Sequence, residues 1–377
     1  MRKMGIYVHI PFCISKCSYC DFASVPLNDT VERYFNALIK EITLRGKELK
    51  RPEVDTVFIG GGTPSSVDYL FIAEVMDALR TAFNISYDAE ISMEANPGTL
   101  TAEKANSYFK AGINRISLGI QSFDEDLLKA IGRIHTAAQT EEAIYLLREA
   151  GFENISGDFM LGLPGQTKES YLDDLNHGCN LGLSHISAYS LILEEGTLLT
   201  ARYDKGLISL PGEDEERLMY HEGVDLLKKR GLIQYEISNF ATTEKTCAHN
   251  IGYWKLKPYL GIGLSAHSYL PGLRFWNTSE FDKYFEMIEQ EEFPIDGEER
   301  INETMRASEF LILGIRMNEG INLQEFYEEF GYRFEDKYEE VINKHINGGL
   351  LERTQDYIRL TRRGFDLSNV VEVDLFK

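Results

Sequence analysis

The sequence lacks any apolar run near the length of about 20 residues that a membrane-spanning helix needs. Its start carries two basic residues, Arg2 and Lys3, but the apolar stretch behind them is too short for a secretory signal, and no small-residue cleavage site follows. We therefore expect a protein that neither spans a membrane nor is exported.

Positive charge is also scarce. The chain holds 39 lysines and arginines against 60 aspartates and glutamates, for a formal net charge of −21. Such a chain repels phosphate backbones and anionic lipid surfaces. Nucleic acid and the membrane surface are therefore excluded as general partners.

Cysteine is the third feature that is scarce in this sequence, and the positions of the cysteines are informative. There are five cysteines, an odd number, and three of them lie close together as Cys13, Cys17 and Cys20. A secreted disulfide framework would spread its cysteines along the chain, so grouped thiols fit a metal site in a reducing compartment better. We expect a cytoplasmic protein.

Short β-rich apolar runs alternate with helix-like segments through the first half of the chain. The expected strands are Ile6–Ile10, Thr56–Ile59, Glu90–Glu94, Arg115–Ile120, Ile155–Met160 and His185–Leu191. The expected helices are Val31–Leu49, Tyr69–Phe83, Thr101–Ala111, Thr136–Ala150 and Thr167–Leu181. This alternation predicts parallel βα units. Six units rather than eight favour an α/β fold with an open, partial (βα)6 barrel, although the pattern also fits a doubly wound sheet.

Polar residues recur where these strands end. The cysteines follow the first strand and Gly60–Pro64 the second, whereas Glu94, Gln121 and Asp158 lie at or near the ends of later ones. The carboxyl ends of the strands form the active face of barrel-like α/β folds. Residue type and position thus predict one functional edge.

The pattern changes after about residue 195. Glu213–Arg230 is expected to be a helix and Gln234–Ser238 a strand; from Glu303 two or three helices precede a hairpin. We expect a barrel core over residues 1–195, a small α+β extension over 196–296 and a C-terminal winged-helix-like domain over 297–377. The acidic character of the last domain is the wrong sign for reading DNA, which favours a structural or partner-docking role.

The cysteine motif is Cys13-Ile-Ser-Lys-Cys17-Ser-Tyr-Cys20. Thiolates suit iron–sulfur clusters and zinc, but a structural zinc site closes four ligands, commonly as two CxxC pairs, and no second pair exists here. Three thiolates in one tight loop suit a [4Fe–4S] cluster with one iron left open. A zinc site and three reduced loop cysteines are the alternatives.

These residues resemble the radical S-adenosylmethionine superfamily, whose signature is CxxxCxxC. Further motifs resemble the oxygen-independent coproporphyrinogen III oxidase family within it: Tyr7–Cys13, Gly60–Pro64, Glu94–Pro97, Gly119–Phe123 and Asp158–Gly165. They stand in the family's order, and the resemblance covers nearly the whole chain.

The resemblance implies a [4Fe–4S] cluster on Cys13, Cys17 and Cys20, with S-adenosylmethionine bound at the open iron. The positions that match cofactor-contacting residues of the family are Tyr7, Gly61, Gly62, Thr63, Glu94, Gln121, Arg133 and Asp158. Any one of them alone is an ordinary polar, turn or core residue; their shared place at one rim gives the set its meaning. Tyr19, in the cluster loop, is expected to pack on adenine or to shield the cluster.

Two departures separate the chain from true coproporphyrinogen oxidases in this family. Those enzymes carry a fourth cysteine two residues past the third, where this chain has Phe22, and they carry an N-terminal extension. This chain has instead His249-Asn-Ile-Gly-Tyr-Trp254, an HNxxYW stretch that resembles the heme chaperone branch of the family.

Heme iron takes imidazole or thiolate ligands, and the porphyrin packs on aromatic faces. We expect His249 as the axial ligand, with Cys247 and His267 as alternatives, while a hydrogen-bonded loop histidine is the plainer interpretation of His249. Cys179 is expected in a helix core.

The leading hypothesis is a carrier that hands heme to an acceptor protein, for which a membrane-associated respiratory enzyme is one candidate. The second is an oxidoreductase that decarboxylates coproporphyrinogen III, and the third is another radical enzyme. A monomer or a cluster-linked dimer fits the carrier hypothesis.

Overall fold

The computed structural model describes residues 3–376. The protein is built around one large, mainly parallel sheet. Six strands are parallel in the order β1-β4-β5-β6-β7-β8. Their bounds are β1 Met4–Ile10, β4 Glu53–Gly61, β5 Asn84–Ala95, β6 Arg115–Gln121, β7 Asn154–Leu161 and β8 His185–Ser190. All six expected strands are confirmed, and β4 and β5 are longer than expected.

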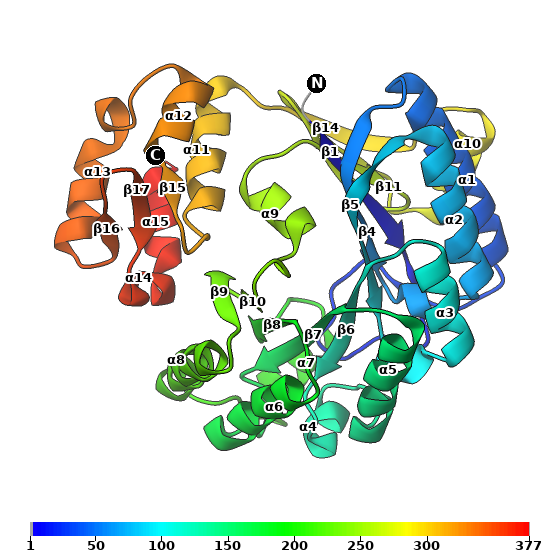
Figure 1. The fold of residues 1–377 in the computed structure, drawn as a ribbon, viewed down its shortest axis with the longest axis horizontal. Helices are drawn as coiled ribbons and strands as arrows, with labels where there is room; N and C mark the ends of the chain where they lie inside the picture. Colours follow the sequence, from blue (N-terminus) through cyan, green and yellow to red (C-terminus); the bar gives the residue numbers. More distant parts are fainter. Residues whose placement is uncertain (1–2, 377) are drawn as a thin grey trace.

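Helices follow these strands and lie outside the curve that the strands form (Figure 1). The main ones are α1 Val31–Glu48, α2 Tyr69–Ala82, α3 Ala102–Lys110, α5 Ala137–Ala150, α6 Lys168–Asn180 and α8 Glu213–Lys229. Short elements between them are α4 Glu125–Ala130, α7 Leu198–Asp204, η1 Pro64–Ser66, η2 Pro97–Thr99 and the paired β2 Phe12–Cys13 and β3 Val25–Pro26. The predicted partial barrel of βα units is confirmed.

Threonine caps explain why three of these helices begin where they do. The hydroxyls of Thr101, Thr136 and Thr167 each accept a hydrogen bond from a backbone N–H of the first turn, and the last two form capping boxes. Gly151 then ends α5 in the left-handed region, at φ 106°, where a side chain would be strained.

The sheet extends beyond the six strands at both edges. Strand β11 (Tyr259–Ile262) lies parallel to β1, and β12 (His267–Leu270), β13 (Leu273–Asn277) and β14 (Ile295–Arg300) follow antiparallel. At the other edge, β10 (Asn239–Ala241) pairs with β8, and β9 (Ile233–Glu236) pairs with β10. The expected strand Gln234–Ser238 is observed as β9, which ends at Glu236, whereas β10 and β11–β14 went unpredicted.

The C-terminal module has the order of a winged helix. Its elements are α11 Glu303–Gly314, β15 Ile321–Asn322, α12 Leu323–Phe330, α13 Glu335–Asn347, β16 Leu351–Arg353 and β17 Tyr357–Leu360, followed by α14 Arg362–Asp366 and α15 Ser368–Leu375. The three strands pair in the order β15-β17-β16 around a hydrophobic core separate from that of the barrel. The winged-helix-like fold is confirmed. The division at residues 195 and 296 stays a prediction, and the strands of 196–296 extend the barrel sheet itself.

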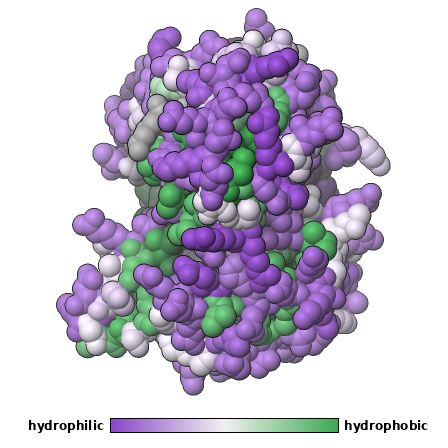
Figure 2. Space-filling view, turned by 90° about the vertical axis from the view of Figure 1, so that its left-hand side faces the viewer, coloured by the Kyte–Doolittle hydropathy of each residue, from purple (hydrophilic) through white to green (hydrophobic). Residues whose placement is uncertain are grey.

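The module packs against the barrel next to helix α9 (Ala248–Trp254), which lies between the two in Figure 1. Arg316, just after α11, lies 3.5 Å from the Glu236 carboxylate and stacks over Trp254 with its guanidinium 4.5 Å from the ring centroid. Helix α10 (Phe281–Glu289) packs on α1 at the opposite side. The face in Figure 2 is mainly hydrophilic, with apolar side chains in patches. No helix within residues 3–376 is both long enough and apolar enough to cross a bilayer.

Candidate functional site

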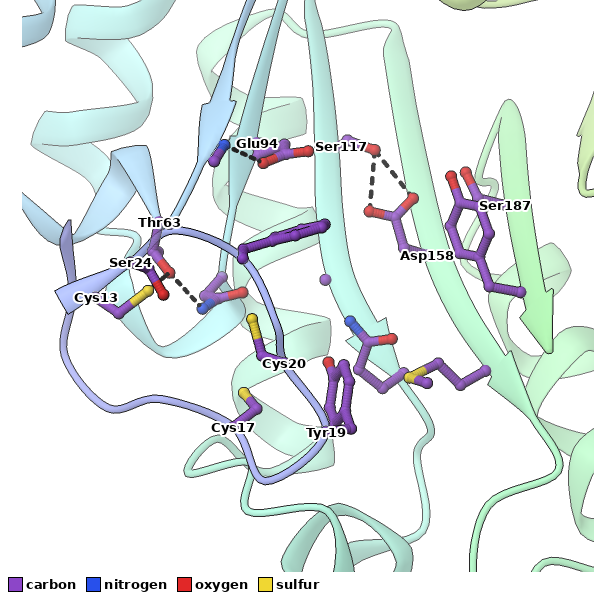
Figure 3. A pocket seen from close by; sticks show the side chains of 18 of the residues that line it. Cys13, Cys17, Tyr19, Cys20, Ser24, Thr63, Glu94, Ser117, Asp158 and Ser187 are labelled. Carbon is purple, nitrogen blue, oxygen red and sulfur yellow. Dashed lines mark hydrogen bonds between the residues drawn. The ribbon is translucent and has the colours of Figure 1, made fainter. Parts of the chain in front are cut away.

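The cysteine loop lies at one end of a cavity of about 530 Å³ that is lined by the carboxyl ends of the barrel strands. Cys13, Cys17 and Cys20 all line it as free thiols, and Figure 3 shows their sulfurs on the same side of the loop. The loop is held at its middle, because Ser18 donates its N–H to the Ile131 carbonyl and accepts from the Leu199 N–H. The three cysteines predicted as a set are thus brought together.

The donor set fits an iron–sulfur cluster. Within the described residues no group of histidine, cysteine and carboxylate side chains is placed to bind a single metal ion. A four-iron cluster is larger than one ion and spreads its thiolate ligands around itself, so three thiols facing one cavity suit it. Cys179 and Cys247 do not line this cavity. The cluster would therefore have three protein ligands and one open iron.

The glycine-rich turn after β4 forms the wall beside Cys13. Gly61 has φ 112°, in the left-handed region, and its N–H donates to Glu94 Oε2 at 3.0 Å. A Cβ on Gly62 would lie 2.7 Å from the Phe12 carbonyl oxygen, so only glycine fits there. The Thr63 hydroxyl contacts the Cys13 sulfur at 3.4 Å. The turn thereby presents backbone directly beside the expected cluster position.

Two half-buried carboxyls, Glu94 and Asp158, lie across the cavity from the cysteines (Figure 3). Burial, with a smaller effect from the neighbouring Asp158, raises the pKa of Glu94 to about 7 against the opposing effects of the Gly61 N–H and Arg115. Burial also raises the pKa of Asp158, whose carboxylate accepts from the Ser117 hydroxyl at 3.0 Å. A ligand with a positive charge would stabilise the ionised form of both carboxyls, as Arg115 of the same cavity already does.

The remaining predicted contacts line the same cavity. Gln121 ends β6 with φ 66°, a backbone strain of the kind found at functional sites. Arg133 donates to the Asn96 side-chain oxygen at 2.8 Å and lies 3.5 Å from the Cys17 sulfur. The Tyr7 hydroxyl bonds His9 Nδ1 at 2.9 Å. All eight expected cofactor positions therefore lie around one space.

Tyr19, from the cluster loop, lines this cavity as well, which is compatible with both roles expected for it. Its ring lies beside the loop cysteines in Figure 3.

Arg115 is a cavity residue that the sequence did not single out. Its side chain is only 2% exposed at the start of β6, and its Nε finds no hydrogen-bond partner among the described residues. The Glu90 and Asp158 carboxyls lie near this cation, and its unused Nε donor could accommodate one further acceptor in the cavity. The available signal was an arginine at the start of an otherwise uncharged strand.

His249 does not face the cavity. It lies on α9, only 2% exposed, with Nδ1 2.8 Å from the Thr56 hydroxyl and Nε2 2.8 Å from the Tyr253 hydroxyl. Its ring stacks on Phe58 with centroids 5.4 Å apart. Both ring nitrogens are buried and hydrogen-bonded, so ligation of heme by His249 would first have to break one of these contacts. The assignment of His249 as the heme ligand stays a prediction. The HNxxYW stretch is a short helix rather than a loop.

The other residues of α9 divide between two tasks. Asn250 and Tyr253 line the cavity, whereas Trp254 lies under Arg316 of the C-terminal module. Cys247, just before the helix, is fully buried, and burial raises the pKa of its thiol to about 12. The motif thus connects the cavity wall to the C-terminal module.

Comparison with known proteins agrees with this arrangement. Residues 7–177 match the model of the radical SAM superfamily, and residues 301–367 match that of the HemN C-terminal domain. The coproporphyrinogen III oxidase HemN from Escherichia coli has a similar structure, with a TM-score of 0.87 and 22% identity over 100% of this chain and 90% of that one. At this identity the similarity establishes the fold.

Sequence relatives are more specific. The chain is 36% identical to the heme chaperone HemW of Bacillus subtilis over 97% of each chain. It is 37% identical to the heme chaperone HemW of Lactococcus lactis over 98% of this chain and 96% of the relative. The chain belongs to the heme chaperone HemW family, within the radical SAM superfamily.

Proposed function

We propose that this protein binds heme and delivers it to an acceptor protein, and that it carries a [4Fe–4S] cluster and S-adenosylmethionine at the barrel cavity. Cys13, Cys17 and Cys20 hold the cluster. When bound, such a cluster would supply one-electron chemistry to the S-adenosylmethionine at its open iron. The proposal is supported by the convergence of these thiols with eight matching cofactor positions on one cavity.

The chain's own residues would bind and orient the cofactor. Gly61, Gly62 and Thr63 let the methionine end approach the backbone closely. Glu94 and Asp158 offset the positive charge of the sulfonium and amino groups, and a cationic ligand would in turn lower the raised pKa of both carboxyls. Arg133 would pair with the carboxylate of S-adenosylmethionine or keep its contact with the Cys17 sulfur.

The structural observation that favours heme carriage over porphyrin decarboxylation concerns the residue at position 22. Oxidases of the family have a fourth cysteine there, whereas this chain has Phe22. Its side chain is 57% exposed and lines the cavity beside the cluster loop. An exposed aromatic face at this point suits a flat apolar ring such as a porphyrin.

The acceptor is proposed to be a heme-requiring protein, with a membrane-associated respiratory enzyme as the candidate to test first. Three closely spaced free thiols support action in the cytoplasm, where cysteines stay reduced. The monomer or cluster-linked dimer stays a prediction.

The test is anaerobic cluster reconstitution, followed by heme titration with and without S-adenosylmethionine and by an assay for coproporphyrinogen III turnover. We expect heme binding at micromolar concentration or tighter and no decarboxylation. Turnover of coproporphyrinogen at enzymatic rates would replace the proposal with the oxidase hypothesis, and a lack of heme binding would end it.

A further inference from the structure

The backbone makes a tight turn at the end of β6, where Gln121 lines the cavity. The Ser122 N–H donates to the Ile120 carbonyl at 2.9 Å, which closes a three-residue turn around Gln121 at φ 66°. A γ-turn with positive φ at its central residue is rare and strained. The pairing of β6 with β7 also shifts its register between Gly119 and Gln121, and such irregularities re-aim side chains beside active sites.

The turn determines where the Gln121 side chain lies. A Cβ built on Gly119 would lie 3.3 Å from Gln121 Nε2, so the amide folds back over the end of its own strand. Gln121 is only 9% exposed, and within residues 3–376 its amide has no hydrogen-bond partner. An amide that is nearly buried, lines the cavity and has no protein partner is available to a bound ligand.

A carboxylate outside the barrel holds this turn. Asp174 lies on α6, is 5% exposed and does not line the cavity. Its Oδ2 accepts from the Ser122 hydroxyl at 2.6 Å, and its Oδ1 accepts from the Phe123 N–H at 2.8 Å. Both residues that follow Gln121 are therefore fastened to one side chain by hydrogen bonds to a carboxylate, which are stronger than neutral ones.

Further contacts surround the turn. The Phe123 ring stacks on His177 of the same helix with centroids 4.2 Å apart, and His135 Nε2 lies 3.2 Å from the Ile120 carbonyl oxygen. Burial raises the pKa of Asp174 to about 6 against the opposing effect of its two hydrogen bonds. Strained backbone persists only where its surroundings over-determine it, and here the surroundings are buried bonds made by residues outside the cavity.

We propose that Asp174 is a positioning residue of the cofactor site, which holds the strained turn so that the Gln121 amide meets S-adenosylmethionine. Asp174 would act only through Gln121, because it does not reach the cavity itself. Its role rests on the proposed function, because it takes Gln121 as a contact of S-adenosylmethionine.

The first test measures the Tm of the full chain, with its cluster reconstituted and without S-adenosylmethionine. Gln121→Gly and Gln121→Ala are compared in the wild-type and Asp174→Ala backgrounds. Both remove the amide, but only glycine adopts positive φ without strain. We expect Gln121→Gly to have the higher Tm while Asp174 is present. In Asp174→Ala the freed turn relaxes, so the advantage of glycine should vanish or reverse.

The second test measures S-adenosylmethionine affinity of the same reconstituted proteins by equilibrium dialysis. Asp174→Ala should bind about tenfold or more weakly and keep its iron content. In Gln121→Ala, which has already lost the amide, Asp174→Ala should cause no further loss. Asp173→Ala is the matched control, because Asp173 is an exposed carboxylate one residue earlier on α6, and it should match the wild type.

The outcomes separate the two levels of inference. If Asp174→Ala weakens binding equally with and without the Gln121 amide, or if glycine keeps its advantage, the positioning role is wrong and the cofactor site stands. If Asp174→Ala does not fold, Ser122→Ala takes its place in both tests, because it removes one of the two bonds to the same carboxylate. If the wild type binds no S-adenosylmethionine, the proposed cofactor site fails, and the positioning role fails with it.

Discussion

The imidazole of His249 joins the motif helix to the barrel through the hydroxyl of Thr56, which lies 2.8 Å from its Nδ1. Thr56 is a buried residue of β4, and the contact spans residues far apart in the chain. The Glu90 carboxylate of β5 accepts from the backbone N–H groups of Ala248 and His249, so a second strand holds the start of the same helix. The HNxxYW stretch is thereby fixed to the sheet by its first residues.

Thr56→Val should destabilise the protein by about 1–3 kcal/mol, because it leaves a buried imidazole nitrogen without its partner while keeping the side-chain shape. The measurement is chemical denaturation of the reconstituted protein. The matched control is Thr81→Val, an exposed helix position whose hydroxyl bonds only its own helix, where a change within about 0.5 kcal/mol is expected. Equal stability of the two variants would mean that the His249 contact does not fasten α9.

Cys17→Ala should abolish the brown chromophore and reduce bound iron to background after anaerobic reconstitution. The variant keeps only two of the three thiolates that the cluster is expected to need as ligands. Cys179→Ala is the control, since Cys179 lies on α6 outside the cavity, and it should keep both iron and colour. Intact iron and absorbance in Cys17→Ala would overturn the cluster assignment.

Much of this site could be predicted from the sequence because the signals are local. The cysteine spacing, the glycine turn and the alternating strands each depend on neighbours in the chain. The burial of Arg115 and the hydrogen bonding of the histidine rings depend instead on residues that are distant in the sequence. No local pattern shows that Thr56 and Tyr253 occupy both nitrogens of His249.

The same distinction between local and distant signals applies to the fold. Threonine caps and glycine stops fixed the helix bounds to within a residue or two, because capping is local chemistry. Strands β11–β14 escaped prediction because they are short and three of them pair antiparallel at the sheet edge, where alternation of βα units ends. A Gly-rich stretch such as that around Gly261 also carries a weak strand signal.

Glu94 should make the stability of the ligand-free protein depend on pH. Its pKa is raised from 4.5 to about 7 in the folded protein, so the folded state binds the proton more tightly than the unfolded chain. The resulting stabilisation is complete below the unfolded pKa and is lost as the pH rises through about 7. Glu94→Gln should remove this dependence, a difference of at most about 3 kcal/mol between pH 4.5 and 8.

The measurement is the free energy of unfolding of both proteins across that pH range, without S-adenosylmethionine. Ser117→Ala serves as a comparison, because it removes a partner of Asp158 and leaves Glu94 in place, so most of the pH dependence should remain. Parallel curves for the wild type and Glu94→Gln would show that Glu94 is ionised in the ligand-free cavity.

Arg316→Met should loosen the C-terminal module from the barrel. The substitution removes the 3.5 Å ion pair with Glu236 and the stacking over Trp254, and it leaves a fully buried carboxylate without its cation. Burial already raises the pKa of Glu236, and Arg316 opposes that effect. We expect the free energy of unfolding to fall by about 1–3 kcal/mol and proteolysis between β14 and α11 to become faster.

The control is Arg359→Met, which breaks an exposed ion pair with Glu352 inside the module, where the cost in stability should stay below about 1 kcal/mol. If both variants resist protease equally, the contact of Arg316 with α9 does not hold the module, and its position rests on apolar packing alone.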